Sequence, residues 1–313
     1  MSVFFRPLPK PVSAAAVAAC VGGGAVVVGD AARTAVGISG IGPGAPNSLA
    51  FCDLAPVAER VARSACALII VGMDDDVVAR PDQTLIRIQD PRRGFIAAVQ
   101  ALLPGSDRPR APAAGIHPDA VVALDAEIAP TAAVGARVVV GARTRIGPGA
   151  VVYDDCTIGA DVCIGPNAVL GWVGLAYHAD AQGHRHFFPH LGGVRIGDAT
   201  DVGAGACICR GMLSDTLIGR QVKIGSLVYV SHGVIIDDGA WISASVALAG
   251  HSHVGADALV GIGAVLIDNV DVASAVMVGG GSVVTRDAAT GEKLVGVPAH
   301  PVAAMKRFGP TPR

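Results

Sequence analysis

The stretch VYVSHGVIIDDG, residues 228–239, places a single histidine, His232, in a run of aliphatic and aromatic side chains. A neutral imidazole has a pKa near about 6.5 and can take a proton from a reacting amine, so His232 is a candidate general base. Further imidazoles lie nearby in sequence, in the segment GHSH and in residues 171–195 (His251, His253, His178, His184, His186, His190). The first question is which elements would position them.

A six-residue repeat runs through the second half of the chain. Large aliphatic side chains recur at every sixth position from Val122 to Leu170, again at Ile196, Val202 and Ile208, and, after a shift of four residues, from Ile218 to Val284. A small or β-branched residue follows four places after most of them. This hexapeptide repeat predicts a mainly β protein, a parallel β-helix of about eight coils with 18 residues per coil and the aliphatic side chains inside.

In a stack of coils, the number of residues between two positions predicts whether they lie on the same face. Residues 18 apart lie one above the other, separated by the usual strand spacing of about 4.8 Å. His232 and Gly250 are 18 apart and each follows its inward aliphatic, Val230 or Leu248, by two places. We expect both to face outward on the same side, which would put a base beside an exposed peptide N–H, as acyl transfer to an amine requires. Alternatively, His232 is an ordinary surface residue of the solenoid.

Composition excludes several classes of function. The chain has 313 residues, 51% of them hydrophobic and 16% charged, with a formal net charge of -2. Such a charge provides no basic surface for nucleic acid. No run reaches the roughly 20 apolar residues of a membrane span, so no integral membrane segment is expected. Seven scattered cysteines suggest neither a disulfide framework nor a zinc site, and a cytoplasmic protein is expected.

The predicted domains follow these patterns. Residues 1–111 alternate helix-like and strand-like segments and read as a small α/β domain. The apolar start, SAAAVAAC, is interpreted as a helix followed by a strand rather than as a signal peptide. Residues 112–288 form the β-helix domain with a long loop at 171–195, and residues 289–313 form a short C-terminal tail. A long loop inside a regular solenoid is more often functional than accidental.

Several segments carry a resemblance to a known family: LGGVRIGD (191–198), CRGMLSDTLIG (209–219), and LVYVSHGVIIDDG followed by VALAG (246–250). With its order of domains, the chain resembles the UDP-3-O-acylglucosamine N-acyltransferases of lipid A synthesis. The resemblance implies a left-handed β-helix, a homotrimer with active sites between subunits, and transfer of an acyl group to the amine of an amino sugar on a UDP carrier. In it, His232 matches the general base and Gly250 matches the glycine whose N–H faces the oxyanion.

The same resemblance suggests substrate-binding residues. Phe51 matches an aromatic residue that stacks on uracil, although it also reads as a core aromatic of the strand LAFC, and Tyr177 matches a tyrosine of the family loop. Tyr229, His251 and Asn269 are expected around the acceptor. Tyr229 and Asn269 stand where the family has glutamine and histidine.

An acidic residue of the family, seven places before the base, is Gly225 here. The usual partners of the base are therefore changed, and with them the contacts to the acceptor.

The acyl donor would be a thioester, either of acyl-carrier-protein phosphopantetheine or of coenzyme A, with no tightly bound cofactor and no metal. The segments VGGGSVVTRD and GVPAHP look more like the ends of coenzyme-A-dependent sugar acetyltransferases. An acyl- or acetyl-CoA-dependent enzyme acting on a different small-molecule amine therefore remains open. So do a catalytically inactive trimeric scaffold and, through His232, His251 and His253, a metal site of the kind found in hexapeptide-repeat carbonic anhydrases.

Overall fold

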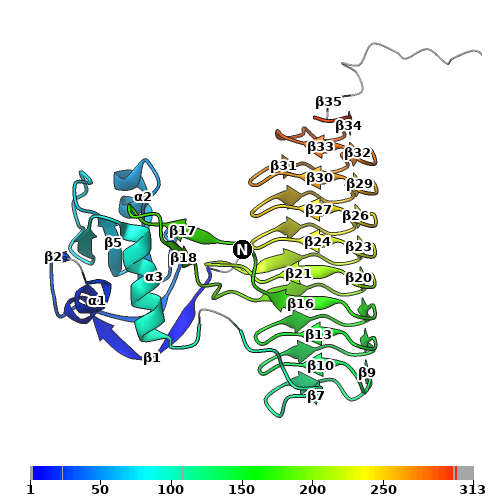
Figure 1. The fold of residues 1–313 in the computed structure, drawn as a ribbon, viewed down its shortest axis with the longest axis horizontal. Coiled ribbons are helices and arrows are strands. Elements are labelled where there is room, and N and C mark those ends of the chain that lie inside the picture. The colour runs from blue at the N-terminus through cyan, green and yellow to red at the C-terminus, as the bar shows by residue number, and fades with distance from the viewer. Residues whose placement is uncertain (1–2, 23, 107–108, 299, 302–313) are drawn as a thin grey trace, which may run out of the picture. The chain divides into compact units, whose positions relative to one another are not determined.

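The computed structural model describes residues 3–22, 24–106, 109–298 and 300–301. The chain forms two compact units (Figure 1). The first consists of residues up to 108 together with 175–192 and 212–214, and the second consists of 109–174, 193–211 and the residues from 215 onward. The predicted loop at 171–195 is thus largely part of the first unit rather than an appendage of the second.

The first unit contains a six-stranded sheet in the order β1-β3-β4-β5-β6-β2. Its strands are β1 (Arg6–Ser13), β2 (Val26–Val28), β3 (Thr34–Ile38), β4 (Ser48–Phe51), β5 (Leu68–Gly72) and β6 (Thr84–Ile88). β3 to β6 pair in parallel, whereas β1 and β2 are antiparallel edge strands. The prolines at 7, 9 and 11 hid β1 from the sequence pattern, and its edge position tolerates them because half of an edge strand's N–H groups need no partner.

Three helices complete this unit: α1 (Ala14–Val21), α2 (Val57–Arg63) and α3 (Pro91–Leu102). Ser13 and Asp90 cap α1 and α3 by accepting hydrogen bonds from the backbone N–H groups of Ala16 and Arg93. Apolar residues of α1 and α3 share one core with alternate residues of the sheet, and α2 joins a second core with the other set. The expected helix at SAAAVAAC and the α/β architecture are confirmed.

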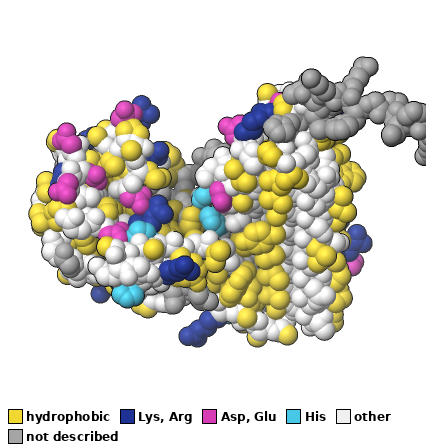
Figure 2. Space-filling view, turned by 45° about the horizontal axis from the view of Figure 1, so that its top comes forward, with side chains coloured by type: hydrophobic (Ala, Val, Ile, Leu, Met, Phe, Trp, Pro, Cys, Tyr) yellow, Lys and Arg dark blue, Asp and Glu magenta, His cyan; other side chains and the backbone are white. Residues whose placement is uncertain are grey.

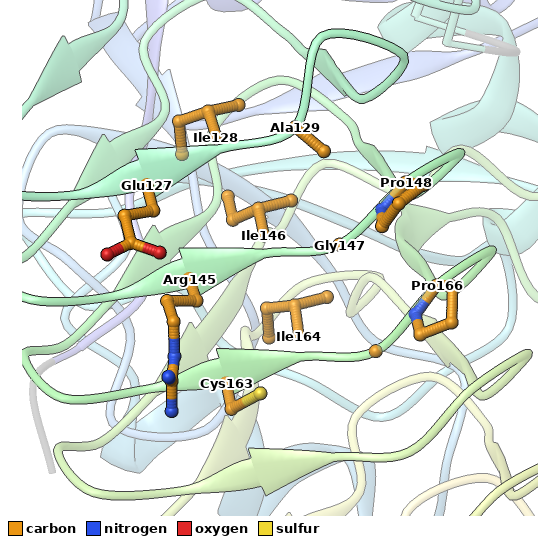
Figure 3. A pocket seen from close by; sticks show the side chains of 11 residues that line it. Glu127, Ile128, Ala129, Arg145, Ile146, Gly147, Pro148, Cys163, Ile164 and Pro166 are labelled. Carbon is orange, nitrogen blue, oxygen red and sulfur yellow. The ribbon is translucent and has the colours of Figure 1, made fainter.

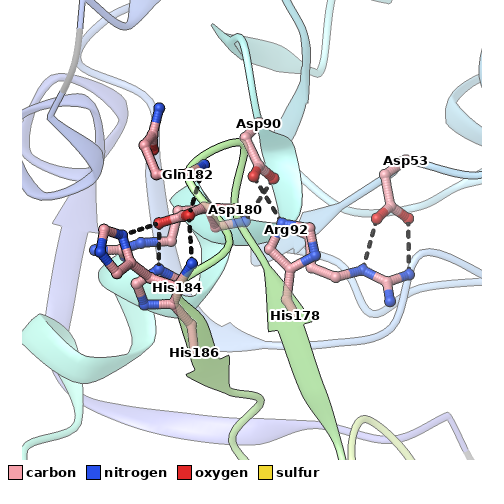
Figure 4. A network of polar contacts seen from close by, with 9 residues as sticks. Asp53, Asp90, Arg92, His178, Asp180, Gln182, His184 and His186 are labelled. Carbon is pink, nitrogen blue, oxygen red and sulfur yellow. Dashed lines mark hydrogen bonds and ion pairs between the residues drawn. The ribbon is translucent and has the colours of Figure 1, made fainter.

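A hairpin from the sequence between the two solenoid segments is built into the first unit. β17 (Tyr177–Ala179) pairs antiparallel with β18 (Arg185–Phe187). His178 Nε2 lies 2.6 Å from Asp90, the cap of α3, and Phe188 is buried in the core with Phe95. At the tip, Asp180 accepts from the backbone N–H groups of residues 182 and 184 and interacts with His186 at 2.8 Å (Figure 4).

The second unit is a parallel β-helix with three sheets, one for each side of the coil (Figure 1). The first comprises β7 (Gly115–Ile116), β10 (Ala133–Val134), β13 (Val151–Val152), β16 (Val169–Trp172), β21 (Cys207–Cys209), β24 (Tyr229–Val230), β27 (Ala247–Leu248), β30 (Val265–Leu266) and β33 (Val283–Val284). The second comprises β8 (Val121–Val122), β11 (Val139–Val140), β14 (Thr157–Ile158), β19 (Val194–Ile196), β22 (Thr216–Ile218), β25 (Ile235–Ile236), β28 (His253–Val254) and β31 (Asp271–Val272). The third comprises β9 (Glu127–Ile128), β12 (Arg145–Ile146), β15 (Cys163–Ile164), β20 (Asp201–Val202), β23 (Lys223–Ile224), β26 (Trp241–Ile242), β29 (Leu259–Val260), β32 (Met277–Val278), β34 (Lys293–Val295) and β35 (His300–Pro301).

The predicted period holds residue by residue. Tyr229 pairs with Ala247, and Val230 with Leu248, 18 residues on. Val230 and Leu248 are fully buried in one continuous core formed by the aliphatic positions and the small residues between them. Each such side chain contributes about 1.5–3 kcal/mol through removal from water. The register shift corresponds to extra residues after β21, so that Ile208 pairs with Val230, 22 places on.

The solenoid runs further than the predicted boundary at residue 288, because β34 adds to β32 in the third sheet. Residues 299 and 302–313 of the predicted tail lie outside the described residues. In the part of the chain that the structure describes, no helix is long and apolar enough to cross a bilayer.

The turns of the solenoid have a fixed chemistry. The third residue after each inward aliphatic has a positive φ at most corners, as in Gly233 (φ 68°), His251 (φ 58°) and Asn269 (φ 61°). Glycine and asparagine adopt this conformation at low cost, whereas a histidine there is uncommon. His251 is therefore held in an unfavourable backbone conformation by the coils around it.

Charged side chains bridge successive coils on the outside. His253 shows this most fully: its Nδ1 lies 2.8 Å from Asp271 on the next coil, and its Nε2 lies 2.9 Å from Asp237. Partial burial opposes protonation of His253, but the two carboxylates outweigh it and raise the pKa of the imidazole above its ordinary value. The raised pKa favours the protonated form of His253, whose ring links neighbouring coils.

Replacing His253 with glutamine should reduce stability in a pH-dependent way. Because the folded-state pKa is raised, the stabilisation is fully present below the ordinary pKa of about 6.5 and is lost as pH rises through the folded-state value. The pair is partly exposed, so the difference in free energy of unfolding should stay below about 1 kcal/mol. Denaturant unfolding of wild type and variant at pH 6 and pH 8.5 measures it, with His117→Gln as an exposed-histidine control. A difference that grows with pH would contradict this interpretation.

Candidate functional site

The predicted base, His232, lies in the turn that follows β24. Its side chain is 9% exposed, so it is neither an ordinary surface residue nor part of the apolar core. Burial lowers the pKa of His232, the nearby His251 lowers it further, and the carboxylate of Asp268 acts in the opposite direction. The imidazole is therefore held mainly neutral at neutral pH, the state in which it can accept a proton.

Gly250 lies directly against the His232 ring. A Cβ atom at Gly250 would stand 2.6 Å from Cε1 and 3.1 Å from Nε2 of His232, closer than real Cβ atoms approach. Gly250 does not need a positive φ, so the requirement for glycine comes from the close approach alone. Within the described residues, the Gly250 N–H donates to no backbone carbonyl, whereas the His251 N–H donates to the His232 carbonyl at 3.0 Å.

His251 completes the corner. Its ring lies edge-on to that of His232, with centroids 5.0 Å apart and an angle of 68° between planes. A Cβ at Gly233, directly below on the stack, would stand 2.5 Å from His251 Nδ1. Burial lowers the pKa of His251, and Asp268 again opposes the shift. Two glycines on adjacent coils thus make room for two imidazoles in contact.

Asp268 belongs to the same corner and was not predicted from the sequence. This residue is 18 places after Gly250 and 36 after His232, so the three share one column of the coil stack. The Cβ position of Gly250 lies 3.0 Å from Asp268 Oδ1 as well as close to His232. The signal that could have found Asp268 is the coil period applied twice from the histidine.

Two other predicted residues border this corner. Asn269 is on the coil after His251, where its N–H donates to the Gly250 carbonyl at 3.0 Å. Tyr229, 38% exposed, lies three residues before His232 in β24, and its hydroxyl accepts a hydrogen bond from the Cys209 thiol, with the two heavy atoms 3.6 Å apart. Burial raises the pKa of Tyr229 to about 12, so the phenol stays neutral.

Phe51 and Tyr177 belong to the first unit. Phe51 stacks on Phe95 at a centroid distance of 4.6 Å, and the guanidinium of Arg92 lies 5.8 Å from its ring centre. Arg92 is in turn paired with Asp53 at 2.7 Å (Figure 4). The core-aromatic interpretation of Phe51 thus has direct packing behind it. Tyr177 is 45% exposed, and its ring contacts Phe187 across the hairpin.

A separate open concavity of about 580 Å³ lies on the third sheet, among β9, β12 and β15 (Figure 3). Its floor is a ladder of isoleucines between Pro148, Pro166 and the outward column Glu127, Arg145 and Cys163. No imidazole lines it. Within the described residues, no group of three or more histidine, cysteine or acidic side chains is arranged to hold a metal ion.

Comparison with known proteins agrees with this architecture. The bacterial transferase hexapeptide family (six repeats) matches residues 137–171. A solved UDP-N-acetylglucosamine acyltransferase from Campylobacter jejuni superposes with a TM-score of 0.50 over 60% of this chain and 73% of that one, at 23% identity. At that identity, the likeness supports the β-helix fold alone.

Relatives are also found by sequence. A UDP-3-O-acylglucosamine N-acyltransferase 2 from Legionella pneumophila is 41% identical over 86 residues, which span 28% of this chain but only 25% of that protein. A UDP-3-O-acylglucosamine N-acyltransferase from Delftia acidovorans is 39% identical over 246 residues, 76% of this chain and 72% of the relative. The extent of this second match, together with the hexapeptide solenoid, shows that the chain belongs to the UDP-3-O-acylglucosamine N-acyltransferase family of hexapeptide-repeat acyltransferases.

Proposed function

We propose that the protein transfers an acyl group from a thioester to the amine of an amino sugar carried on UDP. The observation that supports the proposal is the close approach of the His232 imidazole to Gly250, because a mainly neutral imidazole then neighbours a residue whose N–H, within the described residues, donates to no backbone carbonyl. The relatives named above act, by their names, on UDP-3-O-acylglucosamine or UDP-N-acetylglucosamine. The donor would be a thioester of acyl-carrier protein or coenzyme A.

The proposed reaction needs one base and one oxyanion donor. The amine nitrogen attacks the thioester carbonyl carbon, and His232 takes the proton that the nitrogen loses. The Gly250 N–H donates to the carbonyl oxygen as it becomes negative. When the tetrahedral intermediate collapses, the carbon–sulfur bond breaks and the sulfur takes the proton from the imidazolium. The products are an amide and a free thiol.

A different acceptor is a second candidate, favoured by the surroundings of the base. The position of the family's acidic residue is Gly225, where a Cβ would lie 2.5 Å from the Ala244 backbone nitrogen. A longer side chain is therefore excluded at position 225. In the proposed enzyme, Tyr229 and His251 would provide other contacts to the acceptor. A coenzyme-A-dependent enzyme acting on another small amine fits the same base and glycine. An inactive scaffold would lack turnover with any pair of substrates.

We also propose a homotrimer in a reducing cytoplasm. The outward faces of two sheets carry apolar columns that suit subunit contacts: Tyr229, Ala247 and Val265 on one, and Trp241, Leu259 and Met277 on the other. Figure 2 shows hydrophobic side chains gathered along the solenoid. Trp241 is 57% exposed in the single chain, and burying it between copies would be favourable.

His232→Gln should abolish most acyl transfer without unfolding the protein. Loss of a general base lowers the rate by about 10²- to 10⁴-fold. Mass spectrometry of the acylated product measures the rate, using acyl-carrier-protein and coenzyme A donors with UDP-amino-sugar and small-amine acceptors. Wild-type activity should rise with pH through a midpoint below about 6.5, because the pKa of the base is lowered. His117→Gln is the control; equal rates in the two variants would refute the role of His232.

Gly250→Ala tests the close approach. The added methyl group must displace the His232 ring, and misplacement by about 1 Å can cost 10²-fold in rate. The same steady-state assay, with a crystal structure of the variant, measures both the rate and the ring position. Gly42→Ala is the matched control, since a Cβ there meets nothing within 4 Å. Full activity with an unmoved ring would show that the contact is dispensable.

Assembly is tested by light scattering. The proposal predicts a mass three times the 31.3 kDa of the chain. Trp241→Glu places an unpaired charge in the proposed contact and should shift the mass toward that of the monomer. A wild-type protein that is monomeric at micromolar concentration would contradict the trimer.

A further inference from the structure

Aspartates on the outside of the solenoid are mostly compensated by a cation. Asp155 pairs with Arg137 at 2.7 Å, Asp161 with Arg143 at 2.6 Å and Asp201 with Lys223 at 2.6 Å. Asp237 and Asp271 share His253. These pairs link neighbouring coils, and in each of them a basic side chain compensates the negative charge of the aspartate.

In the part of the chain that the structure describes, Asp268 has no such pair, as is also true of Asp238 and Asp257, but its charge acts on His232 and His251. Its carboxylate is exposed, and across the described residues no lysine or arginine pairs with it. The titratable groups that face it are His232 and His251, and burial keeps the pKa of both imidazoles low. An uncompensated negative charge therefore stands beside two imidazoles that resist becoming positive.

The carboxylate of Asp268 lies close to both Gly250 and His232. The point above Gly250 where a Cβ would stand lies 3.0 Å from Asp268 Oδ1 and 3.1 Å from His232 Nε2. This point cannot itself hold an atom, because His232 Cε1 is only 2.6 Å away, but the distances show that the carboxylate and the imidazole are neighbours over Gly250. A group that reaches the exposed carboxylate of Asp268 beside the ring would meet an anion on one side and a neutral hydrogen-bond acceptor on the other.

We propose that Asp268 binds the protonated amine of the acceptor and holds it beside His232. An ammonium group has three donors and one positive charge, so it can donate to the carboxylate and to Nε2 at once. A hydroxyl group has a single donor and no charge and gains far less. Asp268 is in this way a specificity-determining residue that favours an amine over an alcohol as acceptor. The inference rests on the proposed function for its meaning, but the binding itself does not require turnover.

The low pKa of His232 belongs to the same arrangement. A protonated imidazole would repel an ammonium at this distance, whereas a neutral one accepts from it. Loss of one proton from the ammonium to solvent then leaves the neutral amine between the two groups, ready for attack. The group that binds the cation and the group that takes the second proton are separate side chains in one column.

The binding test uses glucosamine and glucose, which differ in an ammonium against a hydroxyl at one carbon. Protein labelled with ¹³C at histidine Cε1 is titrated with each sugar at about pH 6.5, and the His232 signal is assigned from its loss in His232→Gln. Glucosamine should shift this signal saturably and glucose should not. In Asp268→Asn the affinity for glucosamine should fall by about tenfold, as expected for loss of a charged hydrogen bond. Asp268→Glu should restore part of it.

Asp257→Asn is the matched control, because Asp257 is exposed at a different corner of the same coil as Gly250, after β28. Unchanged glucosamine affinity in Asp268→Asn, an equal shift with glucose, or no shift with glucosamine up to 100 mM would overturn the inference. In steady-state assays the Asp268→Asn defect should appear mainly as a raised KM for the amine. If no donor and acceptor pair is turned over while the shift depends on Asp268, the proposed function fails and the binding inference stands. If turnover is found and Asp268→Asn leaves the KM for the amine unchanged, the binding inference fails and the proposed function stands.

Discussion

Stacking of coils at an interval of 18 residues is the constraint on which the rest of this protein depends. Each coil donates backbone hydrogen bonds to the next, and each inward aliphatic lies over its counterpart, as Val230 does under Leu248. Neither a coil nor its core is stable alone, so the register of one coil fixes that of its neighbours. The outward residues are ordered as a consequence. The position of an outward side chain is fixed by its neighbours on adjacent coils. Residues 18 apart form a column on the surface, so side chains that act together can come from one column.

His232, Gly250 and Asp268 form one such column, and Gly233, His251 and Asn269 form the next. Glycine at alternating heights leaves room for an imidazole on the coil above or below, as the Cβ distances at Gly250 and Gly233 show. The same packing desolvates the rings and lowers their pKa values. The packing at these two glycines therefore determines both the position and the protonation state of the His232 imidazole. A larger side chain at either glycine would change both.

Much of this could be predicted from the sequence because the period is strict. The solenoid, its 18-residue coil and the position of Gly250 one coil above His232 all follow from the six-residue period. The burial of His232 did not follow, since an outward position in an isolated pattern says nothing about the neighbouring ring of His251. β1 was missed because edge strands accept prolines that central strands reject. Asp268 was not predicted because the acidic residue of the family aligns with Gly225, whereas the carboxylate beside His232 comes from two coils further along the chain.

The charges of the corner also constrain the order of events. Asp268 lies beside Gly250, so if the proposed oxyanion forms at the Gly250 N–H, its charge develops near a carboxylate. Two like charges close together are unfavourable unless a cation or a proton lies between them. In the proposed reaction, the imidazolium that forms as His232 takes the proton of the attacking amine is such a charge. Proton transfer to His232 in this reaction therefore has to accompany the development of negative charge on the carbonyl oxygen rather than follow it, because only the imidazolium supplies a positive charge between that oxygen and the carboxylate of Asp268.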